Sequence, residues 1–325
     1  MTRILVSGAS GIVGYGILRS LRLAEKKLHL IGSSIYEDSV APAFCDTFEL
    51  APKTDDPSYL PWLCDCIRSG GIDLIIPGIE IDMHQWARHT TEIESHGARA
   101  MLNNPSLIAL CKDKWRFFQD LQSAVLGCEI ESVLEGTYEE LESRFGRPFL
   151  LKPRRGFGSK GIVRVDGKHV FAKHAAEVGA TLMAQPIIGD DENEFTVSAF
   201  CDGRGGYCAA MSLRRKLSKD GFTEKAEVVE NGQFSAVIEA LCKRYLPVGP
   251  TNFQFRTAGE DLKLLEINPR ISSSTAIRAA FGYNESLMSV DYYLDGRAPI
   301  QPTIRRGKAI RYIDEFIAYE DRLYI

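Results

Sequence analysis

Three polar residues share one face of a predicted strand near the C-terminal end of the chain. Glu266, Asn268 and Arg270 alternate with Ile267 and Pro269, and side chains two residues apart on a strand point to the same face. Carboxylate and amide oxygens are the ligands that Mg²⁺ prefers. An arginine beside them stabilises charge on a transferring phosphoryl group. This strand therefore predicts a metal and phosphate site, with a salt-bridged sheet face as the alternative.

A glycine-rich loop follows another apolar strand, which ends in Lys152. The backbone N–H groups of such a loop can surround a triphosphate, while Lys152 presents an ammonium group to the same phosphates. It is not a Walker loop, because no Gly-Lys-Ser/Thr precedes a helix. We expect residues 154–161 to form a lid, mobile when empty and ordered over triphosphate, rather than a plain hairpin. The candidate phosphate-binding residues here are Lys152, Gly156, Gly158, Ser159 and Gly161.

Two adjacent arginines add further positive charge. Arg214 and Arg215 end a predicted strand, just before the polar loop 217–225. We expect one of them to contact the transferred phosphoryl group and the other to be solvated.

The elements that position these residues fall into two groups. In the first hundred residues, strands alternate with helices, which predicts a parallel sheet with right-handed crossovers. Asn104 and Pro105 suit the N-cap and first position of a helix, so we place a domain boundary after residue 103. The predicted strands are 3–7, 28–32, 73–77 and 98–102, and the predicted helices are 12–23, 59–68 and 81–95.

Beyond this boundary two short helices end near Gln122, and the later strands alternate apolar and polar residues. That alternation suits an antiparallel sheet with one covered face. Helices at 234–245 and 285–294 supply the cover. The predicted strands are 149–152, 162–165, 194–201, 206–213, 252–256 and 262–267.

Gly8, Gly11 and Gly14 follow the first strand and open a helix, as in a dinucleotide-binding turn. Two features oppose a nicotinamide enzyme. None of the 12 tyrosines has a lysine four residues later, and no acidic residue follows the second strand at once. We interpret this segment as a tight strand–helix turn.

Composition limits the remaining classes. With 45% apolar and 25% charged residues and a net charge of −4, the chain is typical of soluble globular proteins and shows no basic surface for nucleic acid or an anionic membrane. It has no stretch of about 18 apolar residues and no apolar leader segment. The eight cysteines and six histidines are dispersed, which favours reduced thiols in a cytoplasm over disulfides or zinc.

Four segments in this order resemble the ATP-grasp superfamily, and the resemblance spans essentially the whole chain. The likeness is to the synthetase halves of the carbamoyl phosphate synthetase large subunit and to related carboxylate–amine ligases. It implies a Rossmann-like domain at 1–103, a small lobe with the lid at 104–186 and a large lobe at 187–325. The segments are 111–118, 149–162, 183–197 and 251–270.

The resemblance also implies residue roles. Lys114 reaches the nucleotide phosphates, the backbone of the hinge at Gln185, Ile187 and Ile188 reads adenine, and Glu194 takes the ribose hydroxyls. Gln254 joins Glu266 and Asn268 as a metal ligand. Pro186 removes one hinge amide, and a serine-rich run at 272–275 stands where many relatives have a glycine pair, which concerns the substrate pocket.

These assignments imply a ligase that uses ATP with Mg²⁺, for which Mn²⁺ can substitute. A carboxylate, such as that of an amino acid, becomes an acyl phosphate that an amine then attacks, releasing ADP and phosphate. The alternatives are a carboxyphosphate-forming enzyme that uses bicarbonate and a non-catalytic nucleotide-binding regulator. Small-molecule substrates and a homodimer are the expected partners, with no nucleic acid and no membrane.

Overall fold

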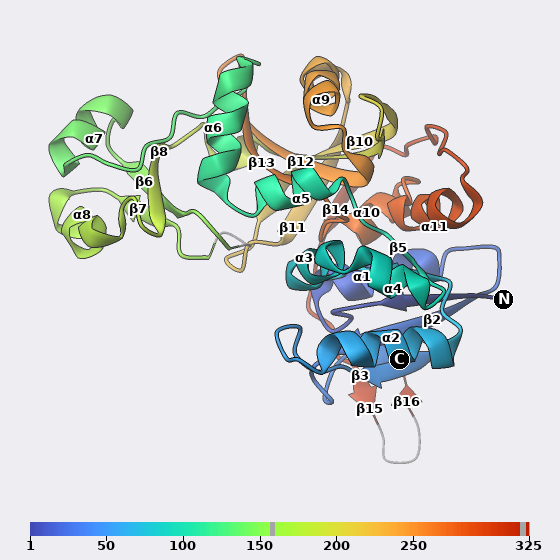
Figure 1. Cartoon of the computed structure of the whole chain (residues 1–325). Coiled ribbons are helices and arrows are strands. Elements are labelled where there is room, and N and C mark those ends of the chain that lie inside the picture. The colour runs from blue at the N-terminus through green and yellow to red at the C-terminus, as the bar shows by residue number, and fades with distance from the viewer. Residues whose placement is uncertain (157–159, 319–322, 325) are drawn as a thin grey trace.

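The computed structural model describes residues 1–156, 160–318 and 323–324 of the chain. Of the predicted lid, Gly158 and Ser159 therefore lie outside the described residues. Figure 1 shows a Rossmann-like domain at one end, a small lobe of α7, α8 and β6–β8 at the other, and a larger lobe between them. The predicted combination of a parallel sheet with antiparallel sheets is confirmed.

The N-terminal domain is a five-stranded parallel sheet in the order β3-β2-β1-β4-β5. Apolar residues on β1, β2 and β4 point to both faces, as expected for a sheet covered on both sides. The strands are β1 (Thr2–Val6), β2 (Leu28–Ser34), β3 (Thr47–Leu50), β4 (Leu74–Ile76) and β5 (Arg99–Ala100). The helices are α1 (Ile12–Leu21), α2 (Tyr59–Gly70), α3 (Glu80–Arg88) and α4 (Thr90–Ser95).

Two details of this domain differ from the sequence interpretation. The helix expected at 81–95 is broken at His89, which ends α3 and precedes α4. The edge strand β3 was not predicted; it is short and half-buried, so its apolar signal is weak.

The glycines after β1 are required by close packing. A Cβ on Gly14 would lie 2.3 Å from the carbonyl oxygen of Gly8, and a Cβ on Gly78 would lie 2.1 Å from that of Ser7 and 2.8 Å from Cα of Gly14. Helix α1 and the turn after β4 thus approach each other backbone to backbone. The tight strand–helix turn inferred from the sequence accounts for Gly14, and Gly78 packs against it from the turn after β4.

The small lobe is a three-stranded sheet in the order β7-β6-β8, with α7 and α8 packed on it. Its core cluster includes Tyr138, Phe149, Phe171 and Ala184. Helix α7 begins with a capping box, in which Thr137 and Glu140 bond each other's backbone N–H. The elements are α7 (Tyr138–Phe145), β6 (Phe149–Pro153), β7 (Val163–Val165), α8 (Lys168–His174) and β8 (Leu182–Pro186).

The large lobe is a six-stranded antiparallel sheet in the order β13-β12-β9-β10-β11-β14. Its helices are α5 (Pro105–Cys111), α6 (Lys114–Ala124), α9 (Gly232–Tyr245), α10 (Thr275–Ala280) and α11 (Glu285–Asp295). Its strands are β9 (Glu194–Asp202), β10 (Tyr207–Leu217), β11 (Thr223–Val229), β12 (Val248–Ala258), β13 (Asp261–Asn268) and β14 (Lys308–Ile310).

The two faces of this sheet differ sharply. Phe195, Val197, Phe253 and Phe255 on one face pack against α6 and α9 in an apolar core. The alternate residues of the same strands are polar; these include Glu194, Thr196, Ser198, Asn252, Gln254, Glu266 and Asn268. The sequence of each strand therefore builds a core on one side and a polar face on the other.

The packing refines the proposed domain boundaries. Helices α5 and α6, which we assigned to the small lobe, contribute Leu107, Phe117 and Leu121 to the core of the large lobe. Conversely, Val290 of α11 belongs to the core on one face of the N-terminal sheet. We keep the division at 1–103, 104–186 and 187–325 as a proposal, with residues 105–124 assigned to the core that they contact.

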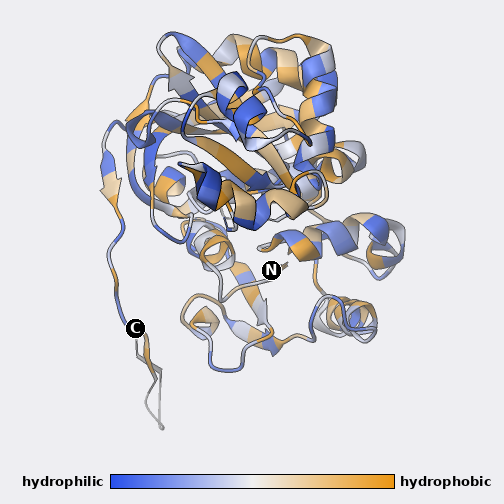
Figure 2. Ribbon diagram, turned by 90° about the vertical axis from the view of Figure 1, so that its left-hand side faces the viewer, coloured by the Kyte–Doolittle hydropathy of each residue, from blue (hydrophilic) through white to orange (hydrophobic). Residues whose placement is uncertain are grey.

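The C-terminal segment leaves the body of the molecule (Figure 2). A short antiparallel pair, β15 (Ile317–Ala318) and β16 (Leu323–Tyr324), ends the chain. In the described part of the chain, no helix has the length and apolar character needed to cross a membrane.

Candidate active site

The polar face of the large sheet brings the predicted metal ligands together. Gln254 on β12 lies opposite Glu266 on β13, and Asn252 lies opposite Asn268. Nδ2 of Asn268 donates to Oε1 of Glu266 at 2.9 Å, and Nη2 of Arg270 donates to Oδ1 of Asn268 at 3.5 Å. The period of two places Glu266 and Asn268 in one row, and Arg270, which was expected on the same strand, lies just beyond the end of β13 and extends the row.

This donor set fits Mg²⁺ that arrives with a nucleotide. Glu266 offers a carboxylate, and Asn268 and Gln254 offer amide oxygens, all of them hard ligands. Oε1 of Gln254 also accepts from Nη2 of Arg215 at 2.6 Å. Within the described residues, no three His, Cys, Asp or Glu side chains are grouped so that they could hold a metal. The ion would therefore need phosphate oxygens to complete its coordination, as Mg²⁺ at phosphate-transfer sites does.

Glu194 is held in place by two arginines. Its Oε1 accepts from Nε and Nη2 of Arg215 at 3.1 and 2.9 Å, and its Oε2 accepts from Nε of Arg256 at 2.9 Å. Both Glu194 and Arg215 are buried. The carboxylate is fixed in orientation, and a ribose hydroxyl would share its oxygens with these guanidinium groups.

Lys152 and Lys114 approach the same site from the small lobe and from α6. Nζ of Lys152 lies 3.4 Å from the carbonyl oxygen of Leu265 and 5.8 Å from the ring centre of Phe118. Nζ of Lys114 donates to the carbonyl oxygen of Gly156 at 2.5 Å. Asp113 accepts from two backbone N–H groups of α6 and pairs with Arg154 at 3.1 Å. Asp113 therefore anchors the N-terminus of α6, and the next residue, Lys114, faces the site.

Burial lowers the pKa of Lys152 to about 8, although the charge of Glu266 opposes this shift. Because phosphate binding needs the ammonium form, the apparent affinity for ATP should fall as the pH rises through 8. We expect a loss of about tenfold between pH 7.5 and 9, in proportion to the charged fraction. Isothermal titration calorimetry measures it. In Lys152→Arg the affinity for ATP should not change over this pH range. If the affinity of the unmodified protein did not change either, Lys152 would not be the phosphate-binding residue proposed.

Two cavities meet at this row of residues. The smaller, about 140 Å³, lies between the lobes and has apolar walls from Ile130, Leu150 and Ile188. The larger, about 440 Å³, lies between the large lobe and the N-terminal domain and reaches the N-terminus of α1. Residues that line both cavities are Lys114, Gly156, Lys160, Leu217, Gln254, Leu265 and Glu266.

Most of the residues predicted from sequence line one or both cavities. The smaller contains Lys152, Gln185 and Glu194, and the larger contains Arg215, Asn268 and Arg270, besides the shared residues. The side chain of Gln185 is buried and donates to Oγ of Ser132 at 2.7 Å. The cavity walls include Pro186 and Ile188 but not Ile187 or Gly161.

Arg214 is a correction to the list of candidate catalytic residues. It is adjacent to Arg215 on β10 and therefore points to the opposite face of the sheet. It pairs with Glu227 of β11, half-exposed and outside both cavity walls. Of the two arginines only Arg215 faces the site, as expected for one of the pair.

Sequence reasoning missed Glu80 and Arg256, and it included Lys160 only as a member of the lid at 154–161. Glu80, at the start of α3, pairs with Arg270 at 3.3 Å and lies 3.6 Å from Nε2 of His84. Arg256 lines the smaller cavity and Lys160 lines both. Arg256 could have been found, because it continues the alternation of Asn252 and Gln254 on β12.

Glu80 is an ionised group in the larger cavity. Burial by itself would raise its pKa, but the nearby imidazole of His84 and the charge of Arg270 outweigh burial and hold the pKa at about 2. Arg270 in turn is oriented by Glu80 and by the carbonyl oxygen of Ile271, at 3.0 Å. The guanidinium group is therefore fixed on the wall between the two domains.

A small lobe and a large lobe that enclose a cation-lined cavity, after a Rossmann-like domain, are the architecture of the ATP-grasp fold. Residues 180–316 match the model of a family described as ATP-grasp in the biosynthetic pathway with Ter operon. The predicted resemblance to the ATP-grasp superfamily and the predicted fold are confirmed. No curated protein sequence matches the chain.

Solved structures show the same fold over nearly the whole chain. An N5-carboxyaminoimidazole synthetase from Staphylococcus aureus complexed with ADP is 18% identical, with a TM-score of 0.69 over 93% of this chain and 80% of that one. A biotin carboxylase–β,γ-ATP complex from Campylobacter jejuni is 17% identical, with a TM-score of 0.70 over 94% and 74%. The biotin carboxylase domain dimer of the Hydrogenobacter thermophilus 2-oxoglutarate carboxylase, with MgADP, ADP and bicarbonate, is 16% identical, with a TM-score of 0.69 over 94% and 73%.

Proposed function

We propose that this protein is an ADP-forming ligase that activates a carboxylate with ATP and couples it to an amine. The observation that carries the proposal is the wall shared by the two cavities, which contains Glu266, Gln254 and Lys114. A nucleotide in the smaller cavity would direct its terminal phosphate toward this wall. An acceptor in the larger cavity would meet that phosphate from the other side.

The residues that line the two cavities account for each part of such a reaction. Lys152, Lys114 and Lys160 offset the charge of the phosphates, and Glu266, Asn268 and Gln254 would hold Mg²⁺. The bound ion would neutralise phosphate charge as a Lewis acid. Arg270 stabilises charge where an acceptor carboxylate oxygen bonds the γ-phosphorus and ADP leaves. Positioning and electrostatics supply the rate without a covalent enzyme intermediate.

The second step uses the opposite wall of the larger cavity. An amine attacks the acyl carbon, the amine loses a proton, and phosphate leaves with the bond electrons. Glu80 is suited to orient an ammonium or amine group, but its pKa of about 2 makes it a poor proton acceptor. His84, 3.6 Å from Glu80, is the better placed base.

Bicarbonate is the second candidate acceptor, because a biotin carboxylase domain with a similar fold is described in complex with MgADP and bicarbonate. The two proposals share every nucleotide residue and differ in the acceptor. A phosphate-release screen separates them: amino acids singly and in pairs, with ATP and Mg²⁺, against bicarbonate with the same amines. Stimulation by bicarbonate alone would replace our proposal.

ATP with Mg²⁺ should raise the melting temperature, and NAD and NADP should not. At about a hundred times its dissociation constant, a ligand adds roughly 2.7 kcal/mol to the free energy of unfolding. Mg²⁺ alone should have little effect, because Glu266 is the one carboxylate among the proposed ligands. Differential scanning fluorimetry measures the shifts. A clear shift with NAD and none with ATP would overturn the nucleotide assignment.

The cellular setting is also a proposal. The eight cysteines are free thiols, which suits a reducing cytoplasm. A homodimer is supported by the description of one structural neighbour as a dimer, and sedimentation velocity would test it.

A further inference from the structure

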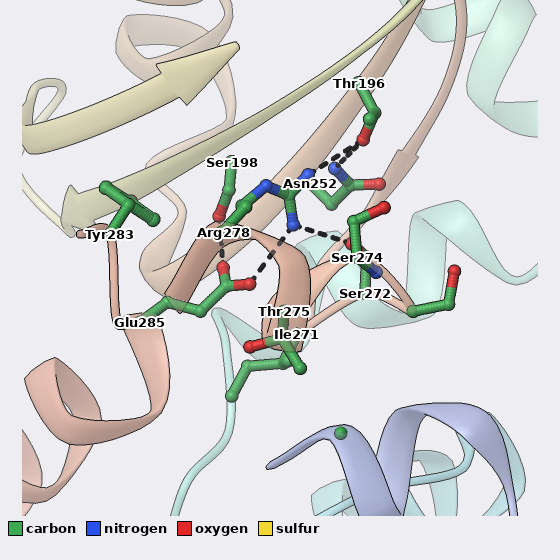
Figure 3. A network of polar contacts seen from close by, with 12 residues as sticks. Thr196, Ser198, Asn252, Ile271, Ser272, Ser274, Thr275, Arg278, Tyr283 and Glu285 are labelled. Atoms are coloured by element: carbon green, nitrogen blue, oxygen red, sulfur yellow. Dashed lines mark hydrogen bonds and ion pairs between the residues drawn. The ribbon is translucent and has the colours of Figure 1, made fainter. Parts of the chain in front are cut away.

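The polar face of the large sheet continues beyond the site into a fully buried cluster under α10 and α11. We call it the Arg278 cluster; Figure 3 shows its side chains converging from β9, β12, the segment after β13, α10 and α11. Its members are Thr196, Ser198, Asn252, Ser272, Arg278 and Glu285, each buried. Neither Arg278 nor Glu285 lines either of the two cavities.

Arg278 joins three parts of the chain through one guanidinium group. Nη1 donates to Oγ of Ser272 at 2.8 Å and to Oε1 of Glu285 at 3.1 Å. Nη2 donates to Oγ1 of Thr196 at 2.9 Å. The other oxygen of Glu285 accepts from Oγ of Ser198. The two charges are 0% and 1% exposed, so the pair is completely removed from water.

A pair buried in this way is a poor means of adding stability. Removing two charges from water is unfavourable, and well-packed apolar residues of similar volume often serve a fold equally well or better. The planar guanidinium does something that apolar residues cannot, because it fixes several partners in defined directions. The partners of Arg278 therefore indicate what the pair is for.

On one side the cluster holds the segment that carries Arg270. Ser272 lies two residues after Arg270, and Ser272 and Ser273 line the larger cavity with it. Oγ of Ser272 also accepts from the backbone N–H of Ser274 at 3.4 Å. Through Ser272, the guanidinium of Arg278 fixes this turn against the sheet.

On the other side the cluster continues into the nucleotide site. Nδ2 of Asn252 donates to Oγ1 of Thr196 at 2.7 Å, and Nε2 of Gln254 donates to Oδ1 of Asn252 at 3.4 Å. Gln254 accepts from Arg215, which holds Glu194. One chain of hydrogen bonds thus runs from Glu194 to the turn at Ser272.

We propose that Arg278 is a positioning residue for the reaction, which sets the turn Arg270–Ser274 at the acceptor cavity relative to the metal and nucleotide residues on the sheet. The proposal rests on the proposed ligase function. Arg278 contacts no substrate in this role. Its removal should therefore affect catalysis and acceptor binding and leave nucleotide binding unchanged.

The main test variant is Arg278→Met/Glu285→Leu, which removes both charges and leaves neither one buried alone. We expect it to fold, to bind ATP within threefold of the unmodified protein, and to lose about 100-fold in kcat, the loss typical of a misplaced catalytic group. KM for the acceptor should rise as well. Arg278→Lys keeps the charge opposite Glu285 but not the bridge to Thr196 and Ser272, so its kcat should be intermediate. If the double variant fails to fold, the kcat and acceptor KM of Arg278→Lys are measured in its place.

Tyr283→Phe is the matched control. Tyr283 is buried beside the cluster and donates to the carbonyl oxygen of Ala209 at 3.3 Å, and its hydroxyl makes no hydrogen bond to residues 270–274 in the described structure. It should destabilise the protein slightly and leave kcat and KM unchanged. If the double variant keeps kcat and acceptor KM within twofold, Arg278 is only structural and the proposal is wrong.

Hydrogen exchange separates this inference from the ligase proposal. In the double variant, the amides of residues 270–274 should exchange at least tenfold faster, with β9 and β12 unaffected. If the unmodified protein releases no phosphate with any acceptor, the ligase proposal fails, and the exchange measurement alone decides whether Arg278 anchors the turn. Unchanged exchange of residues 270–274 would overturn the inference.

Discussion

Glu266→Gln is expected to reduce phosphate release at least about 100-fold, the size of effect seen when one preorganised charged or donor group is lost. Among the described residues, Glu266 is the one carboxylate that lines both cavities. Glutamine keeps its shape and its contact with Asn268 but removes the charge offered to Mg²⁺. Since the side chain is half-buried and faces a cavity, the melting temperature should change little.

The measurement is ADP and phosphate release at saturating ATP with the best acceptor found. Glu227→Gln is the matched control, because Glu227 lies on the same sheet, pairs with Arg214 and is outside both cavity walls. The Glu227→Gln variant should lose at most about 1 kcal/mol of its free energy of unfolding, the usual contribution of an exposed ion pair. Its activity should be unchanged. Near-normal turnover in Glu266→Gln would show that the metal assignment is wrong.

The sequence was most informative where function depends on local periodicity. Glu266 and Asn268 fall on one face because the period of a strand is two residues. Arg270 lies two residues beyond the end of β13 and joins them through its hydrogen bond to Asn268. The same argument applied to β12 would have added Arg256 to Gln254. Lys152 and Lys114 were found through the segments that resemble the ATP-grasp superfamily.

Other parts of the site depend on contacts between distant segments. Glu80 meets Arg270 only because the N-terminal domain packs against the large lobe, across 190 residues of sequence. Its position just after β4 was a usable signal, since ligands of parallel sheets bind beyond the carboxyl ends of the strands. Arg215 pairs with Glu194 because the register between β10 and β9 places the two residues opposite each other. No local sequence pattern distinguishes Arg215 from its neighbour Arg214.

The packing of the helices near the proposed boundaries also depends on contacts between distant segments. Helices α5 and α6 follow the boundary at residue 103 but complete the core of the large lobe, and α11 covers the N-terminal sheet. An amphipathic helix shows that it has an apolar face, but its sequence does not say which sheet that face will cover.

The second large effect is expected at Gly78, in the turn after β4. A Cβ there would lie 2.1 Å from the carbonyl oxygen of Ser7 and 2.8 Å from Cα of Gly14, and backbone atoms cannot move aside as side chains do. Gly78→Ala should therefore reduce the free energy of unfolding by about 3 kcal/mol, at the upper end of overpacking effects. That corresponds to a fall of roughly 10 °C in the melting temperature.

Two controls test whether the loss of stability in Gly78→Ala comes from close packing: the stability of Gly232→Ala and the ATP affinity of Gly78→Ala. Gly232, at the first position of α9, has open space around its Cβ direction, so alanine there should be neutral or stabilising by up to about 1 kcal/mol. ATP affinity of Gly78→Ala, measured well below its melting temperature, should be unchanged, because none of the residues that line the smaller cavity comes from the N-terminal domain. If the glycines near β1 instead served a bound dinucleotide, Gly78→Ala would keep its stability and lose binding of NAD. A variant as stable as the unmodified protein would thus contradict the packing explanation for Gly14 and Gly78.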